Sequence, residues 1–340
     1  MTPDEISALN RWLAPRMNGF RAIERASRFS GGQSNPTYRL ETSGGPLVLR
    51  RKPPGALLKS AHAVEREFRV QEALEDSAVP VAPVHLLCED EAVIGTPFYV
   101  MAEIQGRIFD DPRLPDLTAA QRNGIVGEMN RVLAAIHDVD IGAVGLDDFG
   151  PEGNYFARQL CRWTGQYRAT ETEPLREMDQ LIAWLDAHLP ADDGQRCLVH
   201  GDYRLDNLIF DAATTTCRAV LDWELSTIGH PYADLAGVIM QWAMPPGREG
   251  RGLAGVDRAA FGLWADRQFI ESYCARRKLP PIRNFGFYLA FSFFRMAAIL
   301  QGVKKRALDG NAADPERALG LGRHIPDFAR RGLSAAGGTT

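Results

Sequence analysis

The segment at residues 198–211 combines residue types at a spacing that suits phosphoryl transfer. It reads Leu-Val-His-Gly-Asp-Tyr-Arg-Leu-Asp-Asn-Leu-Ile-Phe-Asp, so four residues separate Asp202 from Asn207. Transfer of a phosphoryl group to a hydroxyl needs a carboxylate that orients and deprotonates the hydroxyl. It also needs oxygen ligands for the Mg²⁺ that bridges the phosphates. Asp202 has the position for the first role and Asn207 for the second.

A second acid follows at the end of the next apolar run, in Val-Leu-Asp-Trp-Glu at 220–224. Asp222 lies where a strand ends, which is where kinases place the aspartate that holds Mg²⁺ against the nucleotide. Taken alone, His200-Gly201-Asp202 could be a simple turn and Asp222 a helix cap. The order of the two motifs, with an apolar hairpin between them, favours the catalytic interpretation.

A glycine-rich turn precedes the first strong strand, in Phe-Ser-Gly-Gly-Gln-Ser-Asn-Pro-Thr-Tyr at 29–38. Backbone N–H groups of such a turn can surround phosphates. The candidates are Gly31, Gly32, Ser34 and Asn35. An ordinary hairpin turn would have the same composition.

Alternation along the strand at 46–50 places Val48 and Arg50 on one face. Val48 could cover an adenine while Arg50 contacts the phosphates, although Arg50 could also be an exposed arginine beside Arg51 and Lys52. In the next helix, Glu67 lies on an otherwise apolar stripe. An acid in that position needs a partner, and we predict that it pairs with Arg50.

The strand at 97–104 ends the strand-rich part of the chain. Where it becomes a linker, Met101, Glu103 and Ile104 could offer backbone groups to the edge of an adenine; an ordinary edge strand is the alternative.

The elements that must position these residues divide the chain in two. Strands are expected at 37–42, 46–50 and 97–104, with helices at 1–16 and 61–74. From residue 117 onward the pattern is mostly helical, apart from a β-hairpin formed by 207–210 and 217–221. Helices are expected at 118–137, 154–168, 174–188, 232–244, 257–277, 285–308 and 315–331. This order predicts an α+β fold with a nucleotide-binding lobe at 1–105, a helical lobe at 106–333 and a disordered tail at 334–340.

Bulk properties limit the partners and the location. The 340 residues carry a formal net charge of −4, which gives no reason to expect nucleic acid as a partner. Five scattered cysteines without a C-x-x-C spacing argue against a disulfide framework or a zinc site. The N-terminus lacks the apolar core of a secretory signal, and Arg295 interrupts the longest apolar stretch. We expect a cytoplasmic protein without a membrane span, whereas its oligomeric state cannot be deduced.

Together these motifs resemble the aminoglycoside phosphotransferase-like family, and within it the kinase-like domains associated with acyl-CoA dehydrogenases. The resemblance implies a two-lobed, protein-kinase-like fold that uses ATP and Mg²⁺. It implies that Asp202 is the catalytic base, that Asn207 and Asp222 are Mg²⁺ ligands and that Asp234 braces the catalytic loop. Arg50 stands where the wider pattern has lysine, and the activation signatures of protein kinases are missing.

The resemblance predicts a phosphotransferase acting on a hydroxyl of a small molecule. A protein kinase and a nucleotide-binding pseudokinase are the alternatives. Aminoglycosides are polycations, whereas residues 154–168 carry three arginines and no acid. An anionic or acyl-CoA-like substrate is therefore the better candidate. The residues proposed to contact it are Arg158, Arg162, Arg204 and Glu224.

Overall fold

The computed structural model describes residues 1–29, 35–53, 63–247, 250–312 and 314–337. The chain forms two compact units. Unit 1 comprises Met1–Asp110, Asp116–Asp147 and His200–Ser226, and unit 2 comprises Asp111–Pro115, Asp148–Val199 and Thr227–Thr340. The segment with the candidate catalytic loop thus groups with the strand-rich N-terminal part. The boundaries of these units differ from the lobe boundary expected at residue 105. That lobe boundary stays a prediction.

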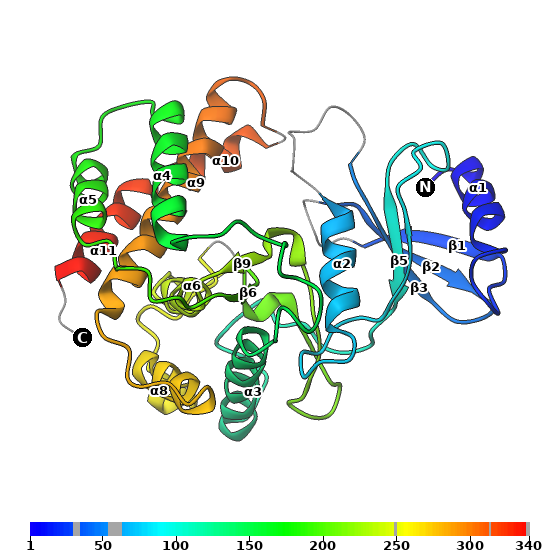
Figure 1. Cartoon of the computed structure of the whole chain (residues 1–340), viewed down its shortest axis with the longest axis horizontal. Helices are drawn as coiled ribbons and strands as arrows, with labels where there is room; N and C mark the ends of the chain where they lie inside the picture. Colours follow the sequence, from blue (N-terminus) through cyan, green and yellow to red (C-terminus); the bar gives the residue numbers. More distant parts are fainter. Residues whose placement is uncertain (30–34, 54–62, 248–249, 313, 338–340) are drawn as a thin grey trace. The chain divides into compact units, whose positions relative to one another are not determined.

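Unit 1 contains a five-stranded antiparallel sheet (Figure 1). Its strands lie in the order β1 (Ile23–Arg28), β2 (Thr37–Thr42), β3 (Leu47–Arg51), β5 (Phe98–Ala102) and β4 (Val84–Cys88). Strands β2, β3 and β5 fall where the alternation of the sequence predicts them. The edge strands β1 and β4 were not predicted.

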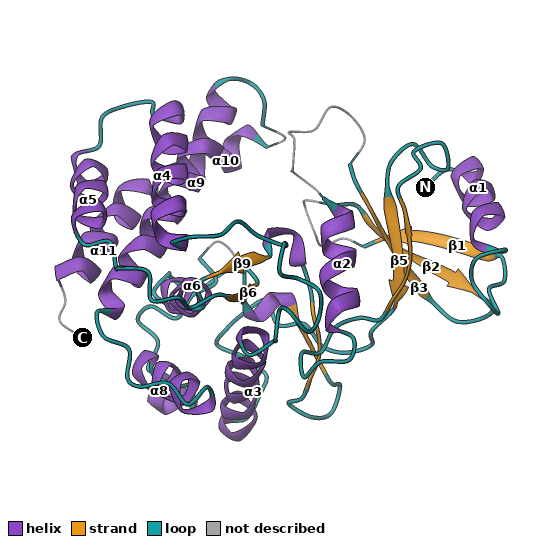
Figure 2. Ribbon diagram, in the orientation of Figure 1, coloured by secondary structure: helices purple, strands orange, loops and turns teal. Residues whose placement is uncertain are grey.

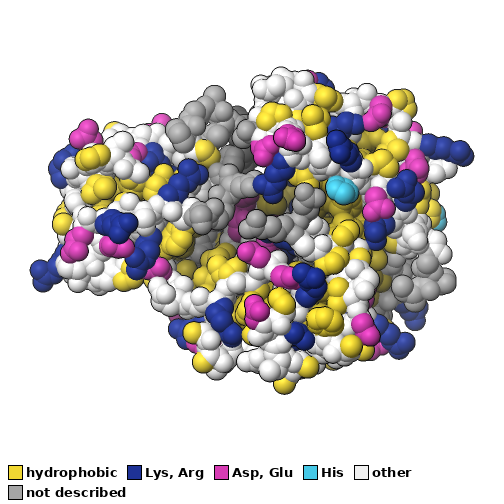
Figure 3. Space-filling model, turned by 180° about the vertical axis from the view of Figure 1, so that it is seen from behind, with side chains coloured by type: hydrophobic (Ala, Val, Ile, Leu, Met, Phe, Trp, Pro, Cys, Tyr) yellow, Lys and Arg dark blue, Asp and Glu magenta, His cyan; other side chains and the backbone are white. Residues whose placement is uncertain are grey.

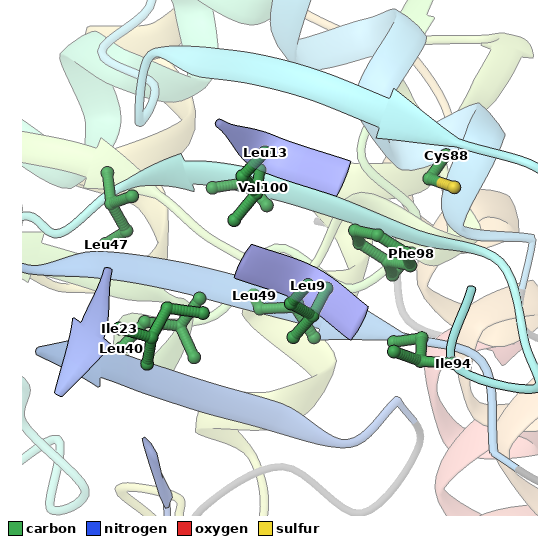
Figure 4. Close-up of a cluster of buried hydrophobic side chains, with 10 residues drawn as sticks. All are labelled: Leu9, Leu13, Ile23, Leu40, Leu47, Leu49, Cys88, Ile94, Phe98 and Val100. Carbon is green, nitrogen blue, oxygen red and sulfur yellow. The ribbon is translucent and has the colours of Figure 1, made fainter. Parts of the chain in front are cut away.

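Each face of this sheet packs against one helix (Figure 2). Leu40, Leu49 and Phe98 pack against Leu9 and Leu13 of α1 (Pro3–Leu13), as Figure 4 shows. Burying each such side chain contributes about 1.5–3 kcal/mol. Because side chains alternate along a strand, the residues between them point to the opposite face. That face is covered by α2 (Val64–Leu74).

The second face holds Val48, Tyr99 and Met101 against Val64 of α2. Arg50, two residues after Val48, lies on this face as well. The strand alternation therefore brings Arg50 toward the helix that carries Glu67.

The rest of unit 1 carries the candidate catalytic segment. It consists of α3 (Ala119–His137), the short helix η1 (Leu205–Asn207), the hairpin β7 (Leu208–Phe210) and β8 (Cys217–Val220), and the short helix η2 (Trp223–Leu225). The linker after β5 joins this hairpin, because Arg107 and Phe210 exchange backbone hydrogen bonds of 2.7 and 2.8 Å. A Cβ atom at Gly106 would lie 2.3 Å from the carbonyl oxygen of Phe210, so only glycine allows this approach.

Unit 2 is mainly helical. Its elements are α4 (Tyr155–Thr170), α5 (Arg176–Ala187), β6 (Cys197–Val199), β9 (Thr227–Gly229), α6 (Tyr232–Trp242), α7 (Arg258–Phe261), α8 (Asp266–Arg276), α9 (Phe285–Leu308), α10 (Pro315–Gly322) and α11 (Ile325–Gly337). Helix α9 is its centre and contacts α4, α5, α6, α10 and α11. Within the described ranges, α9 alone has the length and composition to cross a membrane, with a mean hydropathy of 1.3. Since 61% of that window is buried inside the structure, a core helix explains it as well.

The chain departs from the sequence prediction in three places in unit 2. The helix expected at 257–277 is two helices, because Gly262 adopts a left-handed φ of 70° that ends α7. The helix expected at 315–331 also divides, into α10 and α11. Helix α11 continues to Gly337, so residues 334–337 are helical where a disordered tail was expected.

The face drawn in Figure 3 mixes Lys and Arg with Asp and Glu side chains. This mixture agrees with the small net charge of the chain.

Candidate active site

The centre of the candidate site in unit 1 is an ion pair between β3 and α2. Nε of Arg50 lies 2.7 Å from Oε2 of Glu67, and the two side chains are 12% and 1% exposed. The pair predicted from the helical stripe is therefore confirmed. The neighbouring basic residues point elsewhere: Arg51 binds Glu5 of α1, and Lys52 binds Glu65. Arg50 is thus not part of an exposed basic cluster.

Glu67 is also held by polar groups that the sequence did not reveal. Its Oε1 accepts a hydrogen bond of 2.6 Å from Nδ2 of Asn35, and its Oε2 accepts one of 3.3 Å from the hydroxyl of Tyr99. Gln71 in turn donates to the Tyr99 hydroxyl at 3.0 Å. Burial, reinforced by the charges of Asp222 and Glu224, raises the pKa of Glu67 to about 7 despite the opposing charge of Arg50.

This network gives the side chain of Asn35 a role. Asn35 is 1% exposed and its side-chain amide binds Glu67, so the side chain positions an acid. The expected contact of its backbone N–H with phosphates stays a prediction. Gly31, Gly32 and Ser34, the other members of the predicted phosphate-binding turn, lie outside the described residues.

Asp222 is a second carboxylate that binds Arg50. Its Oδ1 is 2.5 Å from Nη2 of Arg50, and Oε2 of Glu224 is 4.0 Å from the same nitrogen. Asp222 adopts a left-handed conformation with φ 65° and ψ 55°, which is uncommon outside glycine. The indole of Trp223 stabilises this turn by donating to the carbonyl of Val220 at 3.0 Å.

Arg50 therefore lies among three carboxylates. Burial alone would lower its pKa, but the charges of Glu67, Tyr99 and Asp222 outweigh that effect and raise it. The guanidinium remains charged, and the acids around it carry an excess of negative charge when they are ionised. A second cation would be stabilised beside Asp222 by that excess.

His200 connects the catalytic loop to the strand that leads to Asp222. Its Nδ1 accepts from the N–H of Asp202 at 3.2 Å, and its Nε2 lies 2.9 Å from the carbonyl oxygen of Leu221. A carbonyl can only accept, so Nε2 is the donor in this contact. His200 is fully buried, which agrees with a structural role in holding the loop.

Asn207 holds the catalytic loop by its contact with Asp202. Nδ2 of Asn207 donates to the backbone oxygen of Asp202 at 2.9 Å and approaches its Oδ2 at 3.4 Å. The Asp202 side chain is 35% exposed, and Nε of Arg204 lies 3.4 Å from its Oδ1. Asp202 therefore has a carboxylate that a substrate hydroxyl can reach, with a cation beside it.

The two predicted metal ligands both keep an oxygen available. In the described part of the chain, Oδ1 of Asn207 and Oδ2 of Asp222 have no hydrogen-bond partner. The same part contains no group of three or more His, Cys, Asp or Glu residues that could hold a metal by themselves. Mg²⁺ is commonly held by one or two protein oxygens together with phosphates and water, so this pair fits Mg²⁺ bound with a nucleotide.

The residues predicted to surround the base lie on the α2 face of the sheet. Val48 and Met101 are directly opposite each other in the β3–β5 register, and Ile104 packs against the same cluster. The carboxylate of Glu103 is occupied by Arg39, whose Nε donates to both of its oxygens at 2.9 and 3.0 Å. Arg39 was not singled out from the sequence, although its place in β2 opposite Val48 could have revealed it.

The proposed substrate residues lie in both units. Arg204 and Glu224 belong to unit 1 and lie close to Asp202 and Arg50 respectively. Arg158 and Arg162 belong to α4 of unit 2, where Arg158 donates to the carbonyl of Glu152 at 2.6 Å. The guanidinium carbon of Arg162 is 5.4 Å from the centre of the Trp163 ring. The contact of these four residues with a substrate stays a prediction.

The comparison with protein families decides the classification. The family model of the phosphotransferase enzyme family matches residues 25–270. The chain belongs to this family. The resemblance found in the sequence is therefore confirmed.

Relatives of this chain include longer proteins. It is 50% identical over 287 residues to mouse acyl-CoA dehydrogenase family member 10, covering 84% of this chain and 27% of that protein. It is 40% identical over 339 residues to mouse acyl-CoA dehydrogenase family member 11, covering 97% of this chain and 43% of that protein. The chain spans less than half the length of these curated relatives.

Solved structures confirm the two-lobed, kinase-like fold. A crystal structure of a Ralstonia eutropha protein, provisionally named an aminoglycoside phosphotransferase, has 45% identity and a TM-score of 0.89, with 97% of both chains covered. A thermostable mutant of the aminoglycoside phosphotransferase APH(4)-Ia, in a ternary complex with AMP-PNP and hygromycin B, has a TM-score of 0.64. At 16% identity, with 98% of this chain and 100% of that chain covered, this second likeness concerns the fold alone.

Proposed function

We propose that this phosphotransferase transfers a phosphoryl group from ATP, with Mg²⁺, to a hydroxyl of a small molecule other than an aminoglycoside. The observation that carries the proposal is that one unit holds Asp202, Asn207 and Asp222 together with the Arg50–Glu67 pair. Each of the two proposed metal ligands keeps an oxygen available, and Asp202 is accessible.

The roles of the residues follow from their surroundings. Asp202 accepts a hydrogen bond from the substrate hydroxyl and takes its proton as the oxygen bonds to the terminal phosphorus of ATP, while the bond from that phosphorus to the bridging oxygen breaks and ADP leaves. Asn207 fixes the Asp202 backbone and, with Asp222, supplies the oxygens that would hold Mg²⁺. When bound, Mg²⁺ would neutralise charge on the phosphates. Arg50 binds phosphate oxygens, and Glu67 keeps the guanidinium in place.

The acceptor is proposed from charge and from the relatives. Arg158 and Arg162 form no ion pair within the described residues, so no acid offsets their charges, although Arg158 also donates to the carbonyls of Glu152 and Gly153. The names of the relatives, acyl-CoA dehydrogenases, make a hydroxylated acyl-CoA thioester the first compound to try. A screen of hydroxylated metabolites, carried out by measuring ADP release, should begin with such anionic compounds.

The decisive experiment is ADP release by wild type and by Asp202→Asn. We expect turnover with an acceptor to fall by about 10²–10⁴-fold in the variant, the range for loss of a general base. Binding of ATP, measured by calorimetry with Mg²⁺ and with EDTA, should be unchanged in the variant and should depend on Mg²⁺ in both. Retained turnover would remove Asp202 from the mechanism. ATP binding without turnover on any acceptor would favour a pseudokinase, and phosphorylation of proteins would favour a protein kinase.

A further inference from the structure

Two rows of side chains cross the α2 face of the sheet. The strand registers align Thr37 with Arg50 and Arg50 with Tyr99, which gives the first row. The second row, two residues further along each strand, aligns Arg39 with Val48 and Val48 with Met101. Two residues of an antiparallel strand span about 6.8 Å.

Arg39 belongs to this face because its neighbours belong to the other. Leu40 is fully buried in the cluster against α1, and Tyr38 packs against the same cluster. Alternation therefore directs Arg39 to the side of Val48. An arginine is unexpected beside buried Val48 and Met101, which are 6% and 8% exposed.

The guanidinium of Arg39 is held along its edges. Nε donates to both carboxylate oxygens of Glu103, and Nη1 donates to Oε1 of Glu41 at 2.6 Å. All N–H bonds of a guanidinium lie in its plane, so partners at the edges do not occupy its two flat faces with hydrogen bonds. The side chain remains 34% exposed, whereas the Glu103 side chain is 13% exposed.

We propose that Arg39, fixed by Glu103 and Glu41, is a nucleobase-binding residue whose guanidinium stacks on the base of the bound nucleotide. A planar cation that stays partly exposed on the face of Val48 suits a flat aromatic ring, because guanidinium planes stack on such rings. This inference rests on the proposed nucleotide-dependent function and adds the residue that contacts the base.

The position favours the base over the phosphates as the ligand of Arg39. The first row already contains Arg50, which lies at the Asp222 end where the phosphates and metal are proposed. Arg39 lies one row away, beside the hydrophobic side chains that would contact a base. Its carboxylate partners also offset its charge and would weaken attraction to a polyanion.

The test compares ATP with inorganic tripolyphosphate, which lacks a base. Calorimetric Kd values would be measured with Mg²⁺ for wild type, Arg39→Ala and Arg39→Lys. We expect both variants to bind ATP about 3- to 10-fold more weakly, the range of a partly exposed cation–π contact. Binding of tripolyphosphate should not change. Lysine keeps the positive charge but has no planar guanidinium group. Weaker ATP binding in both variants therefore indicates stacking.

Arg25 is the matched control. It lies on β1 of the same sheet and is exposed, so Arg25→Ala removes the same charge without the stacking surface. That variant should bind ATP as wild type does. Thermal unfolding would show whether a variant loses stability because the Arg39–Glu103 pair is gone, separately from any loss of affinity for ATP.

The outcomes are distinguishable. Equal ATP affinity in wild type and Arg39→Ala would make Arg39 only a clamp between strands and overturn the inference. An equal loss of ATP and tripolyphosphate binding would also overturn it, because Arg39 would then bind phosphates. No ATP binding by wild type would overturn the proposed function together with this inference.

Discussion

Glu67 shows why a residue can be located from sequence while its surroundings cannot. Its place on an apolar stripe of α2 predicted a cationic partner, because a buried acid needs one. The donors Asn35 and Tyr99 come from segments 32 residues away on either side and lie beside Glu67 only in the assembled fold. No local pattern could connect them. The identity of Arg50 as the partner needed only the alternation of β3.

The raised pKa of Glu67 has a consequence for stability. The folded protein holds a proton up to about pH 7, whereas the unfolded chain releases it near 4.5. The stability contributed by this group is therefore complete below the unfolded pKa and is lost as the pH rises through the folded pKa. We expect Glu67→Gln, which cannot ionise, to gain about 1–3 kcal/mol relative to wild type between about pH 5 and pH 7.5.

Urea unfolding of ligand-free protein at the two pH values measures this difference. Glu65→Gln is the control, because Glu65 lies on the same helix in a partly exposed pair with Lys52. Its difference from wild type should stay nearly constant with pH. A constant difference for Glu67→Gln as well would mean that Glu67 is ionised throughout.

At the scale of elements, the catalytic loop and the Asp222 turn are held in close contact. Gly201 has a φ of 83°, and a Cβ atom there would lie 2.6 Å from the carbonyl oxygen of Leu225. Because that oxygen belongs to the backbone, it can move aside only if the backbone of η2 shifts. We expect Gly201→Ala to destabilise the protein by about 1–3 kcal/mol and to reduce turnover, since strain at such a position has this magnitude.

Thermal unfolding and ADP release measure both effects. Gly237→Ala is the matched control, because Gly237 lies within α6 and has no atom within 4 Å of its added Cβ. Alanine is the better helix former there, so this variant should gain about 0.5–1 kcal/mol. An unaffected Gly201→Ala would show that the loop can shift away from η2.

The connection between β3 and α2 can be measured by a double-mutant cycle. We expect Arg50→Ala and Glu67→Ala each to weaken ATP binding and turnover, and the double variant to lose less than the sum by about 0.5–3 kcal/mol. The pair of Lys52 and Glu65, at 2.9 Å but partly exposed, is the comparison. Its coupling should stay below about 1 kcal/mol. Additive effects at Arg50 and Glu67 would mean that the ion pair does not position the arginine.

Elements that are long or that alternate were predictable and short ones were not. Strand β2 alternates apolar Tyr38 and Leu40 with polar neighbours, and α3 and α9 are long helices of 19 and 24 residues rich in helix-forming residues. Strands β6 and β9 have three residues each, which is too short for a period to appear. Strand β1, Ile-Glu-Arg-Ala-Ser-Arg, has one buried position, Ile23, and therefore lacks alternation.

At the scale of the whole molecule, the family assignment explains the candidate site but not the acceptor. The chain shares a fold with an enzyme solved with AMP-PNP and hygromycin B, at an identity that supports the fold alone. Its curated relatives are more than twice its length. The acceptor therefore has to be inferred from charge. Of the three arginines of 154–168, Arg168 is neutralised by Asp179 at 2.5 Å and by Glu171.

Arg162 is the most direct test of the acceptor. It is exposed on α4 and has no ion pair within the described ranges, so its charge is available to an anionic substrate. We expect Arg162→Glu to raise the KM for such a substrate by about 10-fold, the effect of reversing a charge near an ionic ligand. The Kd for ATP should not change. Arg176→Glu makes the same charge change at the exposed start of α5 and should leave KM unaltered. Efficient phosphorylation of kanamycin would contradict the anionic acceptor, and an unchanged KM in Arg162→Glu would place this arginine outside the acceptor site.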